Sequence, residues 1–197
     1  MSKLFNFEDQ FTFYAAYHTN KTNVLIHVFC VPTILFTALV LTHGIPGAAK
    51  SFATFDVGRT TVDVTVPFLW AAFNAIYFVL LEPAAGLLYA PILLSLGHLS
   101  NIAYSEHHDA AMKYAGIAFV ASWIAQFVGH GKFEGRAPAL LDSLLQSLVL
   151  AVFFVWLEVL FYLGYRPALF KRLQNRTGVE VAKYRKERAA KAKNKAN

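Results

Sequence analysis

Three histidines stand where apolar segments of the sequence meet polar ones. His18 and His27 lie in YHTNKTNVLIHVFCVP, and His130 lies in WIAQFVGHGKFE. Histidine is the commonest metal ligand in proteins, and it titrates near neutral pH. A polar ring at the end of a hydrophobic helix is costly unless something binds it. The pattern therefore predicts a metal site at a membrane surface, made by these three residues, and chemistry on a lipid.

The spacing of His18 and His27 requires a break in the chain between them. On one unbroken helix, nine steps of about 100° would place the two side chains on opposite faces. The intervening TNKTN supplies the break, because Asn20 and Asn23 can end one helix and start the next. The alternative is that these are separate interfacial histidines, hydrogen-bonded to headgroups and water.

Polar residues around His130 could assist a metal or bind a substrate. Gln126 shares a helical face with His130, and its amide is costly inside an apolar segment without a partner. Glu134 could supply a carboxylate ligand or accept a hydrogen bond near the metal. Alternatively, it is an exposed partner of Lys132 or Arg136. These two cations could also pair with a substrate carboxylate.

The remaining histidines are weaker candidates. His107 and His108 lie in SEHHDAA, which we expect to be a solvated loop. An apolar segment of about eighteen helical residues, or roughly 27 Å, separates this loop from His130. His98 lies inside a predicted span, where a hydrogen-bonded packing residue is expected, and His43 is expected to be exposed. Whether His98, His107 or His108 adds a further ligand remains open.

The donor types narrow the choice of metal. Three histidines without a thiolate suit iron, zinc and other borderline metals. Open histidine and carboxylate sites bind Fe(II) in non-haem oxygenases, whereas three histidines also hold hydrolytic zinc. The spacing alone does not decide between oxidation and hydrolysis. The sequence lacks HExxH, GxSxG and glycine-rich phosphate motifs, so zinc proteases, serine lipases and nucleotide-dependent enzymes have no support.

The composition predicts an all-α, polytopic membrane helix bundle. Hydrophobic residues make up 56% of the 197 residues and charged residues 15%, against about 25% charged in soluble proteins. We expect an N-terminal interfacial helix over residues 5–18, a polar loop over 44–63, and four to five apolar segments. The candidate segments are 23–43, 64–81, 83–104, 112–129 and 140–165.

Glu158 is a carboxylate inside the last of these apolar segments. We expect it to be protonated, to pair with Arg166 or a polar neighbour, or to form part of the wall of a lipid cavity.

Positive charge is concentrated at the end of the chain. Residues 171–197 contain ten Lys or Arg and two Glu, a net charge of +8, so the rest of the chain carries −2. A basic tail after an apolar segment is typical of the cytosolic side of a membrane and can contact anionic lipids. We expect one membrane-embedded catalytic domain over 1–170, a basic cytosolic tail over 171–197, and no nucleic-acid partner.

The number of crossings decides whether the three histidines can meet. Four predicted spans lie between His18 and His130, so the chain returns to the same side of the membrane. Five full crossings would place the basic tail on the opposite side. We therefore expect four spans and one re-entrant or tilted segment, with the site on the cytosolic side.

Two blocks of sequence resemble a fungal family that metabolises phytosphingosine to odd-numbered fatty acids. The blocks are YHTNKTNVLIHVFCVPTILF and WIAQFVGHGKFEGRAPALLDSLLQSLVLAVFF, within a resemblance that runs from about residue 10 to residue 168. The resemblance implies a multi-pass dioxygenase of the endoplasmic-reticulum membrane. It also implies a requirement for Fe²⁺ and O₂, and α-oxidation of 2-hydroxy fatty acids to acids one carbon shorter.

The same resemblance assigns expected roles to residues. His18, His27 and His130 fall on the family's motif histidines, which implies that they bind the metal. Asn23 and Glu134 lie in the matched blocks, as does Gln126, and we expect these to support the ligands or contact the substrate. Two other functions stay open at this point. One is a zinc-dependent lipid hydrolase at the same site, and the other is a non-catalytic lipid-binding module.

Overall fold

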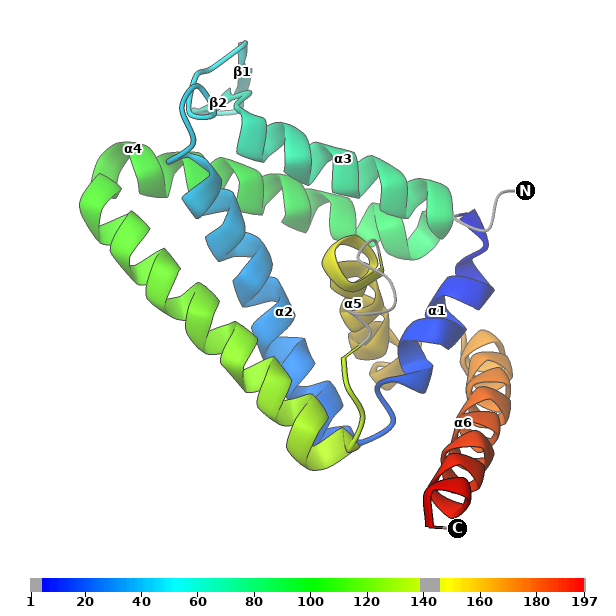
Figure 1. Cartoon of the computed structure of the whole chain (residues 1–197). Coiled ribbons are helices and arrows are strands. Elements are labelled where there is room, and N and C mark those ends of the chain that lie inside the picture. Colours follow the sequence, from blue (N-terminus) through cyan, green and yellow to red (C-terminus); the bar gives the residue numbers. More distant parts are fainter. Residues whose placement is uncertain (1–4, 139–145, 197) are drawn as a thin grey trace.

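The computed structural model of the chain describes residues 5–138 and 146–196 and is mostly helical (Figure 1), as predicted. Helices α1 (Phe7–Ala16) and α2 (Lys21–Thr42) precede strands β1 (Thr54–Val57) and β2 (Thr60–Asp63). Helix α3 (Val66–Leu81) follows, then the long α4 (Pro83–Val128), which continues into a π-helix, η2 (Gly129–Glu134). A second π-helix, η4 (Gln146–Leu150), leads into α5 (Ala151–Tyr162), and α6 (Pro167–Ala196) follows.

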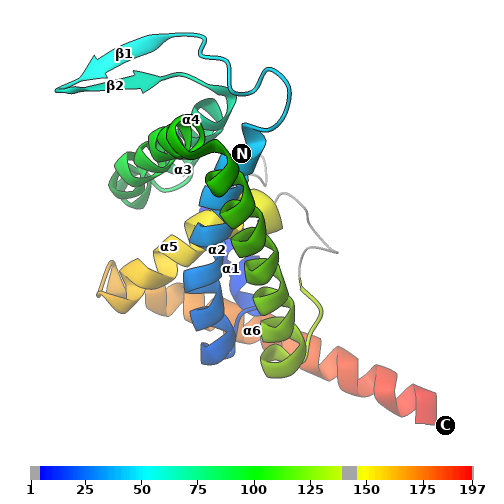
Figure 2. The ribbon, with the colours of Figure 1, turned by 90° about the vertical axis from the view of Figure 1, so that its left-hand side faces the viewer.

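The helices pack around α5. α3 lies along the first half of α4, and α2 lies along the second half (Figures 1 and 2). On α5, Phe153, Phe154 and Leu157 are fully buried. The ring of Phe11 on α1 meets the rings of Phe154 and Phe161 edge-on, at centroid distances of 5.4 and 5.5 Å. Aromatic packing on α5 therefore fixes α1 relative to the rest of the fold.

Side chains with hydrogen-bond acceptors start the helices that carry the candidate site. The side-chain oxygen of Asn6 accepts from the Asp9 backbone N–H before α1. That of Asn20 accepts from the backbone N–H groups of Thr22 and Asn23 before α2. α1 ends at Ala16 and α2 begins at Lys21. The predicted break between His18 and His27 is thus confirmed, and Asn20 is its N-cap.

The segment SEHHDAA is helical, so the prediction of a loop was wrong. Helical geometry runs through it, except at His107, whose φ of −136° and ψ of 37° bend the path. The segment contains no glycine or proline that would end a helix. Most of its residues are exposed, and the ribbon of α4 bends at about its middle (Figure 1). The predicted segments 83–104 and 112–129 are therefore two halves of α4.

Residues 44–63 contain a β-hairpin where a polar loop was expected. Thr54 pairs with Asp63 and Val57 with Thr60 in an antiparallel register. Gly58 lies in the connection with a φ of +63°, a conformation that glycine adopts without a steric penalty. The run of Thr, Phe and Val residues on both sides of this turn favours strands, and it was the available signal.

Two helices of the described chain are long and apolar enough to cross a membrane. They are α2 and the continuous stretch Pro83–Glu134 that includes α4 and η2. The other two apolar helical stretches, Val66–Leu81 and Leu148–Tyr162, are shorter. Residues 139–145, where the predicted fifth segment begins, lie outside the described residues. The predicted number of four to five crossings stays a prediction.

Glu82 ties the start of α4 to the turn between α5 and α6. Its carboxylate accepts hydrogen bonds from the Ala85 backbone N–H at 2.7 Å, the Tyr165 hydroxyl at 2.9 Å and Arg166 Nη1 at 2.5 Å. Glu82 is only 5% exposed. Arg166 binds this buried carboxylate, so of the alternatives considered for Glu158, pairing with Arg166 is not the one that the structure shows.

We expect Glu82→Ala to lower the free energy of unfolding by about 2–3 kcal/mol. The change removes the cap of α4 and leaves the Tyr165 and Arg166 donors without their acceptor. The Arg166 side chain is 51% exposed, so water offsets part of its loss. Thermal unfolding in detergent measures the change, with the exposed Glu106→Ala as the control. Equal midpoints for the two variants would show that the Glu82 contacts add nothing to stability.

Candidate metal centre

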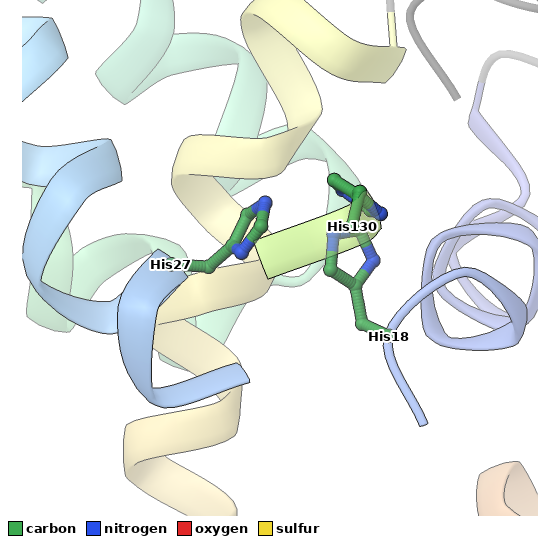
Figure 3. Close-up of side chains that lie close together, drawn as sticks. All are labelled: His18, His27 and His130. Carbon is green, nitrogen blue, oxygen red and sulfur yellow. The ribbon is translucent and has the colours of Figure 1, made fainter. Parts of the chain in front are cut away.

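The structure brings His18, His27 and His130 together from three separate segments. His18 follows the end of α1, His27 lies near the start of α2, and His130 lies in η2. Figure 3 shows their rings close together, and the centroids are 4.5, 4.9 and 5.0 Å apart. One ligand nitrogen from each ring lies within 4.8 Å of the other two. Three nitrogens in this arrangement could hold one ion.

Backbone carbonyl groups orient two of the three rings. Nδ1 of His18 lies 2.8 Å from the Tyr14 carbonyl oxygen, and Nδ1 of His27 lies 2.9 Å from the Asn23 carbonyl oxygen. Each Nδ1–H donates to the carbonyl one helical turn earlier, which leaves Nε2 with a free lone pair. Metal-binding histidines commonly have this second hydrogen bond, which sets the tautomer and the orientation of the ring.

His130 carries a buried nitrogen without a protein partner. The residue is 3% exposed, and its Nδ1 has no hydrogen bond to the described residues. A buried polar atom left unpaired costs about 1–3 kcal/mol. An unpaired imidazole nitrogen beside two oriented imidazoles is a donor set that fits iron or zinc.

Burial keeps the His18 ring neutral. It lowers the pKa of His18 well below the usual range, and the nearby His27 lowers it further. Only the neutral imidazole has the lone pair that a metal ligand needs. The His18 ring is therefore available as a metal ligand at neutral pH.

Glu134 joins the segment after His130 to the turn between α1 and α2. Oε1 accepts hydrogen bonds from the backbone N–H (2.9 Å) and the hydroxyl of Thr19. Oε2 accepts from the Asn20 backbone N–H at 3.0 Å and from Asn23 Nδ2 at 3.1 Å. Both carboxylate oxygens of Glu134 thus accept hydrogen bonds, and Glu134 forms no ion pair with Lys132 or Arg136 among the described residues.

Asn23 on α2 lies against Gly129 at the start of η2. Asn23 is fully buried. A Cβ atom at Gly129 would lie 2.5 Å from Asn23 Oδ1, which is closer than real contacts allow. Glycine at position 129 therefore lets the helix that carries His130 approach the helix that carries His27.

The other predicted site residues lie around the cluster without joining it. Gln126 is partly buried one turn before His130, and its side chain has no hydrogen bond to any described residue. Lys132 is exposed, with its Nζ 5.8 Å from the centroid of the Phe133 ring. Arg136 is half-buried, and its Nη1 donates to the Ala16 carbonyl at 3.1 Å. Arg136 is thus tied to the end of α1.

The remaining histidines lie outside the three-histidine cluster. His107 and His108 lie at the bend of α4, at the far end of its second half from His130. His98 has a buried Nδ1 with no hydrogen bond to the described residues, so the expected hydrogen bond at that atom is not formed. His43 is 3% exposed and stacks on Tyr104, so the expectation of an exposed residue was wrong.

Sequence reasoning missed the role of Thr19. Its backbone and hydroxyl groups bind Glu134, and it stands directly after His18 in the TNKTN turn. That turn was recognised as a break, but its free backbone N–H groups were not recognised as donors for a carboxylate. An unpaired run of N–H groups before a helix is a general anion-binding feature, and it was the available signal.

Comparisons with known proteins identify the family of the chain. The family described as 2-hydroxy-palmitic acid dioxygenase Mpo1-like matches residues 4–163. The 2-hydroxy-palmitic acid dioxygenase MPO1 of Saccharomyces cerevisiae is 38% identical over 186 residues, which cover 94% of this chain and 97% of the yeast protein. No solved structure matches the chain. A match over most of both chains shows that the chain belongs to the Mpo1-like family.

Proposed function

We propose that this protein is an Fe²⁺-dependent dioxygenase that converts 2-hydroxy long-chain fatty acids into fatty acids one carbon shorter, as a step in the degradation of phytosphingosine. The observation that carries the proposal is the convergence of His18, His27 and His130 within 4.8 Å. The relative of known activity is named a 2-hydroxy-palmitic acid dioxygenase. Zinc has no redox chemistry, so a dioxygenase at this donor set requires a metal such as iron.

The proposed reaction balances without a further reductant. A 2-hydroxy acid and O₂ have the same atoms as the shortened acid, carbon dioxide and water. Iron held by the three imidazoles would supply the redox chemistry that O₂ needs and would bind the carboxylate and hydroxyl groups of the acid. His18 and His27 would hold it through Nε2, because their Nδ1 atoms are bound to the Tyr14 and Asn23 carbonyl groups.

The protein's own contribution is to position these groups and exclude water. Glu134 and Asn23 fix the turn between α1 and α2 against η2. The three histidines are between 3% and 9% exposed, so water is largely excluded from the ligand atoms. Strong electrostatic interactions and few side reactions are expected in such a site.

We further propose that the protein is embedded in the endoplasmic-reticulum membrane as a multi-pass protein. Its outward surfaces support this, because large apolar side chains on α3 and α4 face away from the fold, where a soluble protein would place polar residues. The exposed apolar residues of these two helices include Leu69, Trp70, Phe73, Ile76, Leu80, Ile117, Val120, Ile124 and Phe127. The acyl chain of the substrate would lie among lipid and apolar helices, gaining about 0.8 kcal/mol for each CH₂ group removed from water. In this arrangement 1–170 is the catalytic unit and the basic residues from 171 onward face the cytosol.

Lys132 is our candidate for binding the substrate carboxylate. It is exposed and forms no ion pair with the described residues, whereas Arg136 is held by the Ala16 carbonyl. We expect Lys132→Ala to raise KM about threefold without a change in kcat, because an exposed ion pair contributes roughly 0.6 kcal/mol. Steady-state kinetics measure this, with Lys50→Ala as the control. A fall in kcat at unchanged KM would contradict the assignment.

The decisive test of the proposed function is a metal-dependent product assay. Purified protein is stripped of metal, reloaded with Fe²⁺ or Zn²⁺, and incubated with 2-hydroxypalmitic acid in air. We expect the acid one carbon shorter, detected by mass spectrometry, only with Fe²⁺ and only when O₂ is present. Turnover restored by Zn²⁺ without O₂ would instead favour a hydrolase, and lipid binding without turnover under either condition would favour a non-catalytic module.

A further inference from the structure

The C-terminal helix is packed onto the fold. Arg172 and Arg176 on α6 bind Glu8 on α1 at 2.6 and 3.0 Å, and Arg176 also binds Asp9. The hydrogen bond from Arg172 is the first cause that lowers the pKa of Glu8 below its usual value. Leu173 is fully buried beside these ion pairs. The first turns of α6 therefore hold the N-terminal part of α1.

Further along α6, a second set of contacts reaches the segment that follows the cluster. The guanidinium carbon of Arg136 lies 3.3 Å from the centroid of the Tyr17 ring and 3.9 Å from the centroid of the Tyr184 ring. The cation is thus enclosed between one ring from the end of α1 and one from α6. Arg188 Nη1 also donates to the Gly135 carbonyl at 3.0 Å. We call the three side chains of Tyr17, Arg136 and Tyr184 the aromatic pin.

The aromatic pin connects the two histidine-bearing segments that lie farthest apart in the sequence. Tyr17 is the residue before His18, and Arg136 lies six residues after His130. Arg136 also donates to the Ala16 carbonyl. Its guanidinium group therefore contacts the end of α1 twice, at the Tyr17 ring and at this carbonyl. A planar cation enclosed by two rings is held in position and orientation, which a lysine ammonium in the same place would not provide.

We propose that Arg136 is a positioning residue. It is held between the rings of Tyr17 and Tyr184, and through it α6 keeps His18 at the distance from His130 that a shared metal ion requires. This rests on the proposed function only in that the three histidines hold a metal. The pin sets the distance between two ligands and does not contact the ion. Loss of the α6 ring should therefore weaken metal binding, although Tyr184 lies on a helix that contributes no histidine to the cluster.

The test compares two substitutions of Tyr184 in the full-length protein. We expect Tyr184→Ala to weaken binding of Fe²⁺ or Co²⁺ to the metal-free protein about tenfold, the order found for outer-shell substitutions. Tyr184→Phe keeps the ring and should bind metal as the unchanged protein does. Tyr162→Ala is the matched control, because Tyr162 is 91% exposed. Anaerobic titration calorimetry gives the affinities, and KM for the 2-hydroxy acid should not change in Tyr184→Phe.

Two results would overturn the proposal. Unchanged metal affinity in Tyr184→Ala would show that the pin does not position the ligands, and equal weakening in Tyr184→Phe would show that the ring face is not what matters. Hydrogen exchange keeps the pin testable if the unchanged protein binds no metal, an outcome that would defeat the proposed function alone. In that case Tyr184→Ala should still speed exchange in residues 15–19 and 130–136, and unchanged exchange there would reject the pin.

Discussion

Replacing His130 with alanine is expected to abolish stoichiometric iron binding and to lower turnover of a 2-hydroxy acid by about 10³-fold or more, roughly 4 kcal/mol of transition-state free energy. The ring is one of three donors in the cluster, and the described residues offer no carboxylate or thiolate within it. Glu134, four residues after His130, has both oxygens occupied by hydrogen bonds. Among the described residues, no further His, Cys, Asp or Glu is grouped with the cluster to replace the lost nitrogen.

The control for this prediction is His108→Ala. His108 is exposed, pairs with Asp109 at 2.9 Å and lies at the bend of α4. It is expected to keep full iron content and activity. A second measurement separates loss of metal from loss of fold: added Fe²⁺ should raise the unfolding midpoint of the His108→Ala protein and leave that of His130→Ala unchanged. Full activity in His130→Ala would reject the three-histidine site.

The part of the site that the sequence could predict depends on local rules. Asn20 is an efficient helix cap, and nine residues of unbroken helix cannot bring His18 and His27 together. A break between them was thus predictable from the TNKTN turn alone, and the structure has it. The convergence with His130 was predicted from an even number of membrane crossings between the two blocks. The histidines do converge, but that number of crossings stays a prediction.

The bend of α4 was not predictable in the same way. Side-chain polarity reports exposure to water, and SEHHDAA is exposed both in a loop and on the outside of a helix. The deciding feature is a single residue, His107, with a non-helical φ and ψ. α4 packs against both α2 and α3, and tertiary contacts of this kind commonly override local preference.

The packing of α6 against the rest of the fold was only partly predictable from the sequence. The charge of residues 171–197 favours a solvated tail, and much of the helix is indeed exposed. Leu169 and Leu173, at a helical spacing, are nevertheless buried, and they were the local signal for a packed face. The partners of the arginines could not be found from the sequence, because Glu8 and Arg172 are separated by 164 positions.

The partners of Glu134 could not be found from the sequence either, because Thr19, Asn20 and Asn23 lie more than 110 positions away. From the sequence it could equally be a metal ligand, an acceptor or an exposed ion-pair partner. Only the structure shows that four donors converge on it. These four hydrogen bonds link η2 to the α1–α2 turn, so we expect removal of Glu134 to have the second-largest effect on the site.

We expect Glu134→Ala to weaken iron binding by about 10–100-fold and to lower kcat/KM to a similar extent, while some activity at saturating iron remains. The backbone N–H groups of Thr19 and Asn20 lose their acceptor, so the turn that carries His18 can move away from η2. Glu134→Gln should be nearly as harmful. Its amide nitrogen would face the N–H donors of Asn20 or Asn23 where Oε2 now accepts. Metal titration of both variants measures the effect.

The outcome separates an acceptor from a metal ligand. If Glu134 positions the turn, excess Fe²⁺ should restore much of the turnover of Glu134→Ala, because the three imidazoles are still present. If it ligated the metal directly, saturation would not restore the rate, since the donor set itself would have changed. The control, Glu187→Ala, removes an exposed carboxylate on α6 and should leave iron affinity unchanged. Unchanged iron affinity in Glu134→Ala would mean that the hydrogen bonds between η2 and the turn do not hold the histidines in place.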